Sequence, residues 1–301
     1  MKTQRFGIEI EMTGITRAKA AEITVEFFGA GARLEHKGGT YDEYRVITQD
    51  GRSWKFVSDA SILPHKKEYG RIVTVDRDYS VELVSPILTY EDIETLQELV
   101  RQLRHAGALS DSTYQAGIHI HIESKNHTPL SMKNLINLMA SKEDLLYKSL
   151  EIDPARLRYC KKVNENLITT INKKKPKTLE ALADIWYAGY GEENRHRKYH
   201  SSRYAGLNLH SVFEKGTLEF RLFNGTTHAG KIKAYIQFCL AVSHQAISQK
   251  AASARRTYTD NEKYTFRCWM LRLGLIGEEF ETCRHHFLAK LQGNSAWRNA
   301  A

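Results

Sequence analysis

Apolar and polar residues alternate with a period of two in several segments of the chain, the pattern of β-strands that bury one face. The clearest examples are Phe6–Met12, Ser53–Asp59, Tyr79–Ser85, Gly117–Ser124 and Thr217–Phe223, with Tyr44–Thr48 and Ala205–Phe213 as further candidates. An Asp50-Gly51 pair, typical of tight hairpin turns, joins Tyr44–Thr48 to Ser53–Asp59. The sequence therefore predicts a sheet that contains at least one hairpin.

Longer segments have apolar residues at helical spacing. They are Thr89–His105, Leu130–Leu150 and Lys231–Lys250, followed by two amphipathic helices within about 261–291 that divide near Gly274 and Gly277. Because helices interrupt the strands irregularly, the order favours an α+β fold with an antiparallel sheet over a doubly wound one. We expect one catalytic domain over residues 1–255 and a C-terminal helical extension over residues 256–301.

The polar faces of the predicted strands are unusual in composition. Residues two apart on a strand share a face, so each strand separates its apolar residues from a polar set. That polar set contains Glu9, Glu11, Glu82, His119, His121, Asn208, Glu219 and Arg221. A solvated sheet face would favour Thr, Ser, Lys and Tyr instead. Neighbouring carboxylates repel one another unless a cation lies between them, so the pattern predicts a cation site.

The donor set of this predicted site indicates which cation it holds. It consists mainly of carboxylates with one or two imidazoles and contains no thiolate. Hard oxygen donors suit Mg²⁺ or Mn²⁺, particularly where phosphate oxygens complete the coordination shell. Zinc would be expected to use a tighter, histidine-rich set.

The polar residues also form an ordered series of motifs. These are Gly7-Ile8-Glu9-Ile10-Glu11, Val81-Glu82-Leu83-Val84-Ser85-Pro86, Gly117-Ile118-His119-Ile120-His121 and Gly216-Thr217-Leu218-Glu219-Phe220-Arg221. In this order they resemble the motifs of the glutamine synthetase-like carboxylate–amine ligases, most of all the short bacterial and phage amidoligase branch. That branch also shows segments like Ser58–Ser61 and Arg203–Leu209. The resemblance covers about residues 6–225.

The resemblance implies a fold and a reaction. The fold would be an antiparallel sheet like that of the glutamine synthetase catalytic domain, with a polar concave active-site face and helices packed on the other face. The reaction would be ATP- and Mg²⁺-dependent: a substrate carboxylate attacks the γ-phosphate of ATP to give an acyl phosphate and ADP. An amine then displaces phosphate and forms an amide or isopeptide bond.

The resemblance also implies residue roles. The Mg²⁺ ions would be held by Glu9, Glu11, Glu82, His119 and Glu219, and the nucleotide would lie near His121 and Asn208. The transferred phosphoryl group would be stabilised by Arg221 and Arg203. The amine would be oriented or deprotonated by Asp59. The chain is much shorter than full-length glutamine synthetases and shows no counterpart of their N-terminal ring-forming domain. Neither ring assembly nor glutamate as the substrate therefore carries over.

The net charge of the 301-residue chain is +9, and its basic residues concentrate in the middle third, at Lys161-Lys162, Lys173–Lys177 and Arg195–Lys198. Such clusters are typical of solvated helix ends and loops, and they also suit contact with phosphate or with an acidic amino acid or peptide substrate. They do not favour nucleic acid, since the aromatic residues of an RNA-binding sheet are missing. The stretch Gly189–Ser202 is a candidate lid over the site.

The cysteines and the hydropathy indicate the compartment. Cys160, Cys239, Cys268 and Cys283 are scattered without a CxxC pair, which suits a reducing environment. No apolar run approaches the roughly 20 residues of a membrane span. We therefore expect a cytoplasmic protein with no membrane partner. For the C-terminal helices, packing on the sheet, homodimer formation and partner binding all stay open.

Three alternative functions remain open at this stage. A guanidino-kinase-like phosphotransferase would share the sheet but form no amide. A metal-dependent hydrolase or nuclease would use the same carboxylates without requiring ATP. A basic, non-enzymatic binding protein would need no metal, because its sheet face would simply be solvated.

Overall fold

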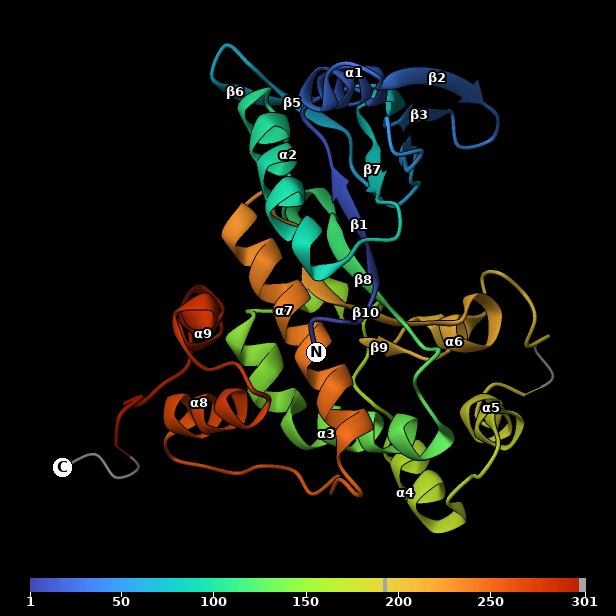
Figure 1. Ribbon diagram of the computed structural model, residues 1–301, viewed down its shortest axis with the longest axis vertical. Coiled ribbons are helices and arrows are strands. Elements are labelled where there is room, and N and C mark those ends of the chain that lie inside the picture. Colours follow the sequence, from blue (N-terminus) through green and yellow to red (C-terminus); the bar gives the residue numbers. More distant parts are fainter. Residues whose placement is uncertain (192–193, 298–301) are drawn as a thin grey trace. The chain divides into compact units, whose positions relative to one another are not determined.

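The computed structural model describes residues 1–191 and 194–297 (Figure 1). Its strands are β1 (Phe6–Met12), β2 (Arg33–Gly38), β3 (Glu43–Ile47), β4 (Ser53–Val57), β5 (His65–Glu68), β6 (Arg71–Thr74), β7 (Val81–Val84), β8 (Gly117–Glu123), β9 (Leu207–Asn208) and β10 (Thr217–Asn224). Its α-helices are α1 (Arg17–Phe28), α2 (Ile93–His105), α3 (Pro129–Ser149), α4 (Glu165–Lys174), α5 (Leu179–Tyr187), α6 (His210–Lys215), α7 (Ala229–Ser248), α8 (Glu262–Arg272) and α9 (Glu281–Leu288).

The fold is α+β with a large antiparallel sheet, as the sequence predicted. Within the described residues the sheet has eight strands in the order β2-β3-β4-β7-β1-β8-β10-β9, and β5 pairs with β6 separately. The chain divides into two compact units, which we name the N-terminal unit (residues 2–120 and 223–233) and the C-terminal unit (residue 1, residues 121–222 and 234–301). Strands β8 and β10 each contribute residues to both units.

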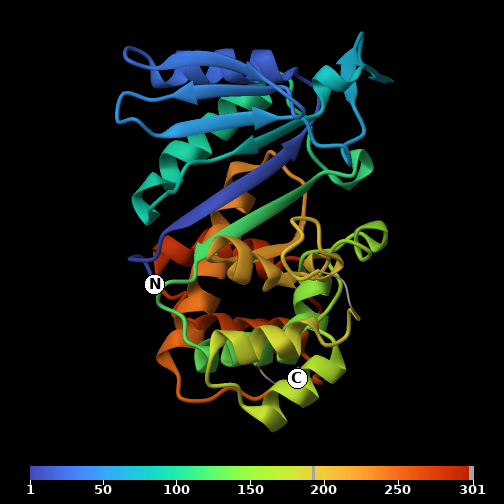
Figure 2. The ribbon, with the colours of Figure 1, turned by 90° about the vertical axis from the view of Figure 1, so that its right-hand side faces the viewer.

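The N-terminal unit is built on the strands β1 to β4 and β7. The Asp50-Gly51 turn between β3 and β4 forms as predicted: the Gly51 amide donates to the Thr48 carbonyl at 2.8 Å, and Gly51 has a φ of +81° that suits glycine. Helix α1 packs against β3 and β4, and α2 packs against α1, so both helices lie on one side of these strands (Figure 2). The alternating residues Ile8, Ile10 and Met12 of β1 are buried.

The C-terminal unit is mainly helical. Helices α8 and α9 pack onto α7 through a cluster of buried aromatic rings, in which Phe238 of α7 lies 4.7 Å from Phe287 of α9 and 5.5 Å from Trp269 of α8, measured between ring centroids. Helix α3 also contacts α9. The C-terminal helices thus have an apolar packing partner within their own unit. The predicted domain boundary at residue 255 stays a prediction.

One predicted strand is wrong over most of its length. The segment Ala205–Phe213 forms only the two-residue strand β9 and then turns into α6. The side chain of Asn208 accepts a hydrogen bond from the backbone amide of His210 at 2.9 Å, which satisfies a free helix N-terminal amide and favours the turn. The strand predicted to reach Asp59 ends at Val57, and Tyr79 belongs to a 3₁₀ turn before β7.

Several elements had no sequence prediction, namely α1, α4, α5, β2, β5 and β6. Strand β2 is largely exposed on both faces, so it lacks the alternation of a half-buried strand. The sequence of helix α4 is mostly polar, and Ile171 is its one fully buried residue, so the apolar signal for a helix is weak. In the described part of the chain no helix is both long and apolar enough to cross a membrane.

Helix α3 buries a carboxylate that the predicted function does not use. Glu143 is 1% exposed, and its two side-chain oxygens accept hydrogen bonds from the Val163 amide at 2.9 and 3.0 Å. Burial raises the pKa of Glu143 to about 7 from an ordinary value of 4.5. The folded protein therefore keeps this proton over a pH range in which the unfolded chain has lost it.

This difference predicts a pH-dependent stability. Because the folded state binds the extra proton, the free energy of unfolding falls as the pH rises from about 4.5 to 7. Glu143→Gln does not titrate and keeps an acceptor for the Val163 amide. We expect the stability of Glu143→Gln relative to wild type to rise across this range, by up to about 3 kcal/mol.

Urea unfolding of both proteins at a series of pH values measures this change. The exposed variant Glu180→Gln serves as the control, and its curve should run parallel to that of the wild type. A constant difference between Glu143→Gln and wild type from pH 4.5 to 8 would show that Glu143 has an ordinary pKa.

Candidate functional site

The N-terminal unit brings together the acidic residues of β1 and β7 with a histidine of β8. Glu11 lies directly opposite Glu82 in the β1–β7 register. The His119 side chain lies between two of the glutamates: its Nδ1 is 3.1 Å from Glu9 Oε2 and its Nε2 is 3.8 Å from Glu11 Oε1. The alternation on β1 and β8 therefore positions these residues as the sequence predicted, with the isoleucines of both strands buried on the other face.

Burial separates this cluster from an ordinary solvated sheet face. Glu11 is only 4% exposed and His119 only 5%. One oxygen of Glu11, Oε2, accepts the Gly117 amide at 2.6 Å. Removing carboxylates from water is costly unless opposite charge or hydrogen bonds compensate, so a face that keeps glutamates there has a specific use for them.

The same residues fit a hard divalent cation. One donor atom each from Glu9, Glu82 and His119 lies within 4.8 Å of the other two, and the same holds for Glu11, Asp59 and Glu82. Glu82 belongs to both groups. With four carboxylates and one imidazole, the donor set suits Mg²⁺ or Mn²⁺. We refer to Glu9, Glu11, Asp59, Glu82 and His119 as the carboxylate cluster.

Asp59 has a structural role in addition to its place in this cluster. Its Oδ1 accepts the Ser61 amide at 2.6 Å, which closes the turn after β4. Its carbonyl oxygen accepts from Arg77 Nη2 and from Ser80 Oγ, both at 2.6 Å. These contacts fix the Asp59 backbone, so the carboxylate is held in the cluster. Its predicted role towards the amine stays a prediction.

The C-terminal unit holds a second polar group, around Glu219. Asn208 pairs with Glu219 in the β9–β10 register, and Asn208 Nδ2 donates to Glu219 Oε2 at 2.7 Å. Arg221, two residues further along β10, forms an ion pair with Glu219 Oε1. His121 Nε2 lies 3.9 Å from the same oxygen, and His121 Nδ1 lies 3.1 Å from Thr217 Oγ1. We name Asn208, Glu219, Arg221 and His121 the arginine cluster.

Arg203 is placed differently. It ends a 3₁₀ turn, Ser201–Arg203, and its guanidinium lies 5.2 Å from the centre of the Tyr199 ring and 5.7 Å from that of Tyr204. Within the described residues no direct contact joins it to Arg221 or Glu219. The structure thus groups Arg203 with aromatic rings, and its predicted phosphoryl contact stays a prediction.

Comparison with protein-family models matches residues 2–243 to a family described as "Putative amidoligase enzyme". The chain belongs to this amidoligase family. The match includes all of the predicted site residues and supports a ligase activity in general. A search of curated proteins found no significant match.

The amidoligase chain also contains site-supporting residues that the sequence did not reveal. Tyr187 of α5 bonds to the buried His210 through Oη and Nδ1 at 2.6 Å. Burial raises the pKa of Tyr187 to about 12 and lowers the pKa of His210, so both side chains are favoured in their neutral forms. The His210 amide in turn holds Asn208 Oδ1, which turns the Asn208 amide nitrogen towards Glu219.

Three features of the chain explain why this support was missed. Helix α5 was not predicted, His210 was placed on a strand, and the bond from Tyr187 to His210 spans 23 residues of sequence.

The structure explains why position 206, in the Arg203–Leu209 motif, is a glycine. A Cβ there would lie 2.2 Å from Tyr147 Oη, so only glycine lets the chain pass α3 before β9 begins.

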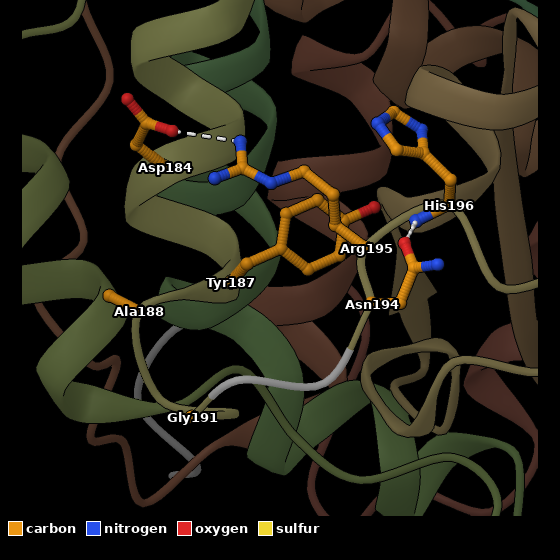
Figure 3. Close-up of a pocket in the computed structure, with 7 residues that line it drawn as sticks. All are labelled: Asp184, Tyr187, Ala188, Gly191, Asn194, Arg195 and His196. Carbon is orange, nitrogen blue, oxygen red and sulfur yellow. Dashed lines mark hydrogen bonds and ion pairs between the residues drawn. The ribbon is translucent and has the colours of Figure 1, made fainter.

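A cavity of about 500 Å³ lies in the C-terminal unit (Figure 3). It is lined by Asp184, Tyr187, Ala188, Gly191, Asn194, Arg195 and His196. Arg195 Nη1 pairs with Asp184 Oδ1 at 2.9 Å, so the cation of this cavity is satisfied internally. The cavity includes part of the predicted lid, Gly189–Ser202. Of that stretch, residues 192–193 lie outside the described residues, and the lid stays a prediction.

The hydrogen bond from Asn208 to Glu219 predicts the effect of an isosteric change. Asn208→Asp replaces the donor with a second carboxylate beside Glu219, whereas Asn208→Ala only removes it. We expect Asn208→Asp to destabilise the protein by about 1–3 kcal/mol at pH 8, and more than Asn208→Ala does. At pH 4.5 the penalty should shrink, because protonation of one carboxylate restores a donor.

Thermal unfolding of the three proteins without added metal measures this difference. An Asn208→Asp variant that is as stable as wild type at pH 8 would contradict the assignment of the Asn208 amide.

Proposed function

We propose that this amidoligase is an ATP- and Mg²⁺-dependent, ADP-producing ligase that joins a carboxylate to an amine through an acyl phosphate. The observation that carries the proposal is the carboxylate cluster, in which the buried Glu11 lies opposite the half-buried Glu82 and beside the buried His119. A solvated sheet face or a plain binding surface gives no reason to bury these charges together. Membership of the amidoligase family supports the choice of a ligase.

The proposal assigns metal binding to Glu9, Glu11, Glu82 and His119, with Glu219 as a further ligand. Bound Mg²⁺ supplies positive charge that offsets the phosphate oxygens and the attacking carboxylate. Glu219 already accepts from Asn208 and Arg221. Each carboxylate oxygen has two lone pairs, so these contacts are compatible with a ligand role.

The reaction has two bond exchanges. A substrate carboxylate oxygen attacks the γ-phosphorus of ATP, and the bond to the β,γ-bridging oxygen breaks, which releases ADP. The amine nitrogen then attacks the acyl carbon, and the carbon–oxygen bond breaks, which releases inorganic phosphate. In this proposal Arg221 stabilises the phosphoryl oxygens with His121 and Asn208 near the nucleotide, and Asp59 accepts the proton of the amine. Arg203 is a second candidate for the phosphoryl contact.

The first test measures ADP release with Mg²⁺ and ATP against pooled acids, amino acids and peptides, with hydroxylamine present. Hydroxylamine captures an acyl phosphate as a hydroxamate. We expect both ADP and hydroxamate. ADP without hydroxamate would indicate a phosphotransferase, and turnover without ATP would indicate a hydrolase. No ADP and no hydroxamate across a broad pool would count against a ligase.

The second test is Glu11→Gln, which removes the charge and keeps the volume and an acceptor for the Gly117 amide. We expect turnover to fall by about 100-fold or more and Mn²⁺ to bind about tenfold or more weakly, while circular dichroism and the melting temperature change little. The control Glu22→Gln, at an exposed position of α1, should behave as wild type. Unfolding of Glu11→Gln would mean that Glu11 is structural.

The third test is Arg221→Lys, which keeps the charge but loses the planar guanidinium that holds Glu219. We expect kcat to fall by about 100-fold, with a smaller change in KM for ATP, since the arginine acts on the transferring group. The exposed change Arg255→Lys is the control. Equal kcat values for Arg221→Lys and wild type would remove Arg221 from the chemistry.

A further inference from the structure

A groove of about 540 Å³ lies in the C-terminal unit, next to the cavity beside Tyr187, and Ala188 lines both. Its walls come from α4, from the end of α5, from the loop 161–164 and from the segment 204–207 that leads into β9. No step of the proposed reaction uses this groove. Its lining therefore needs its own explanation.

The floor of the groove is apolar and its rim is aromatic. Ile185 and Leu207 are buried beneath it, and Trp186 is 7% exposed. The indole Nε1 of Trp186 has no hydrogen-bond partner within the described residues, although it is buried. Tyr190 and Tyr204 stand beside this floor. Such a surface takes an apolar side chain together with a group that accepts a hydrogen bond.

The wall formed by α4 is polar. Asn166 and Thr170 line the groove together with Leu167, and Asn164 caps the same helix with its Oδ1, which accepts the Asn166 amide at 2.8 Å. Amide and hydroxyl side chains of this kind pair well with a peptide backbone, which offers both donors and acceptors.

The net charge around the groove is positive. Residues 155–215 contain thirteen Lys and Arg against six Asp and Glu, so this stretch holds +7 of the net charge of +9. Lys162 and Arg195 are paired with Asp144 and Asp184. By contrast, Lys161 in the groove lining has no ion-pair partner among the described residues, and the same is true of the lysines at the basic end of α4, Lys173, Lys174, Lys175 and Lys177.

We propose that this groove binds an acidic peptide, with an aliphatic or aromatic side chain on the Trp186–Leu207 floor and carboxylates at Lys161 and along the end of α4. The inference rests on the proposed ligase function and names its substrate class: the peptide carries the carboxylate that is activated. Binding energy from a part of a substrate that does not react can lower the barrier at the part that does.

The pleat of β9 separates the groove from the reacting groups. Leu207 lines the groove, while Asn208, the next residue, turns to the other side and donates to Glu219. β9 is the last strand of the sheet order. A peptide in the groove therefore reaches the arginine cluster by passing around this edge of the sheet. The groove then binds those residues of the peptide that flank its reacting carboxylate.

The arrangement of cations favours a peptide over nucleic acid. A nucleic-acid groove carries cations along its length, to match a phosphate at each nucleotide. Here the groove lining holds Lys161 and the paired Lys162, and the other unpaired lysines gather at one end of α4. The walls between them are amide and apolar side chains, which suit a peptide.

The test uses fluorescence anisotropy of the full chain without ATP. The probe is a short fluorescein-labelled peptide in which glutamates flank a Leu-Phe pair. The comparison probes are the same peptide with lysines in place of glutamates and a labelled oligothymidylate. We expect the acidic peptide to bind tightest, with an affinity that weakens as salt is raised. Tighter binding of the oligothymidylate would overturn the proposal in favour of nucleic acid.

Variants locate the binding in the groove. Lys161→Glu reverses the exposed charge there and should weaken the acidic peptide about tenfold, and Leu167→Gln should weaken it several-fold. Lys125→Glu makes the same charge change at an exposed lysine outside the groove and should stay within about twofold of wild type. Melting temperatures check that each variant is folded. Equal losses in Lys161→Glu and Lys125→Glu would show that only net charge matters and would overturn the groove.

The outcome also separates the groove from the ligase. One outcome is peptide binding that depends on Lys161 while no hydroxamate forms. It would support the groove as a peptide-binding site, but it would contradict both the ligase function and the proposal that the peptide is its substrate. Hydroxamate formation from small acids together with no peptide binding keeps the ligase and overturns the groove.

Discussion

The burial of Glu11 opposite Glu82, with His119 beside it, is the constraint on which this structure depends. Two carboxylates at facing positions of paired strands repel each other, and little water reaches Glu11 to screen that repulsion. The N-terminal unit tolerates this electrostatic repulsion in a sheet whose other face packs into an aliphatic core. A bound divalent cation removes the conflict, and phosphoryl transfer between anions is chemistry that needs such a cation.

The arginine cluster solves a different electrostatic problem. Glu219 is buried, but its two oxygens are occupied by Arg221 and by the Asn208 amide. The orientation of Asn208 depends on the His210 amide, and His210 depends on Tyr187. A guanidinium held in this way keeps its direction, which is the property that stabilisation of a transferring phosphoryl group requires. In the arginine cluster the charge of Glu219 is thus compensated by a guanidinium and a side-chain amide of the same unit.

The sequence predicted what depends on strand periodicity and missed what depends on tertiary contacts. Glu9, Glu11 and His119 could be placed because alternation assigns a face to each residue of a strand. The partnership of Asn208 with Glu219 needed the register of β9 on β10, and the turn after Asn208 arose from a local hydrogen bond that competes with strand formation. Tyr187 lies on α5, a short amphipathic helix that was not predicted, and its bond to His210 is a tertiary contact. The family resemblance predicted Arg203 beside the transferred phosphoryl group, whereas in the structure its guanidinium lies beside the rings of Tyr199 and Tyr204.

The central claim is that a carboxylate of the substrate becomes an acyl phosphate, and isotope transfer tests it most directly. An acid that this amidoligase turns over is labelled with ¹⁸O in its carboxylate, and the inorganic phosphate released with amine present is examined by mass spectrometry. The account predicts one ¹⁸O atom in each phosphate, because the attacking oxygen leaves with the phosphoryl group. Phosphate without ¹⁸O, formed while ATP is consumed and the amide appears, would contradict it.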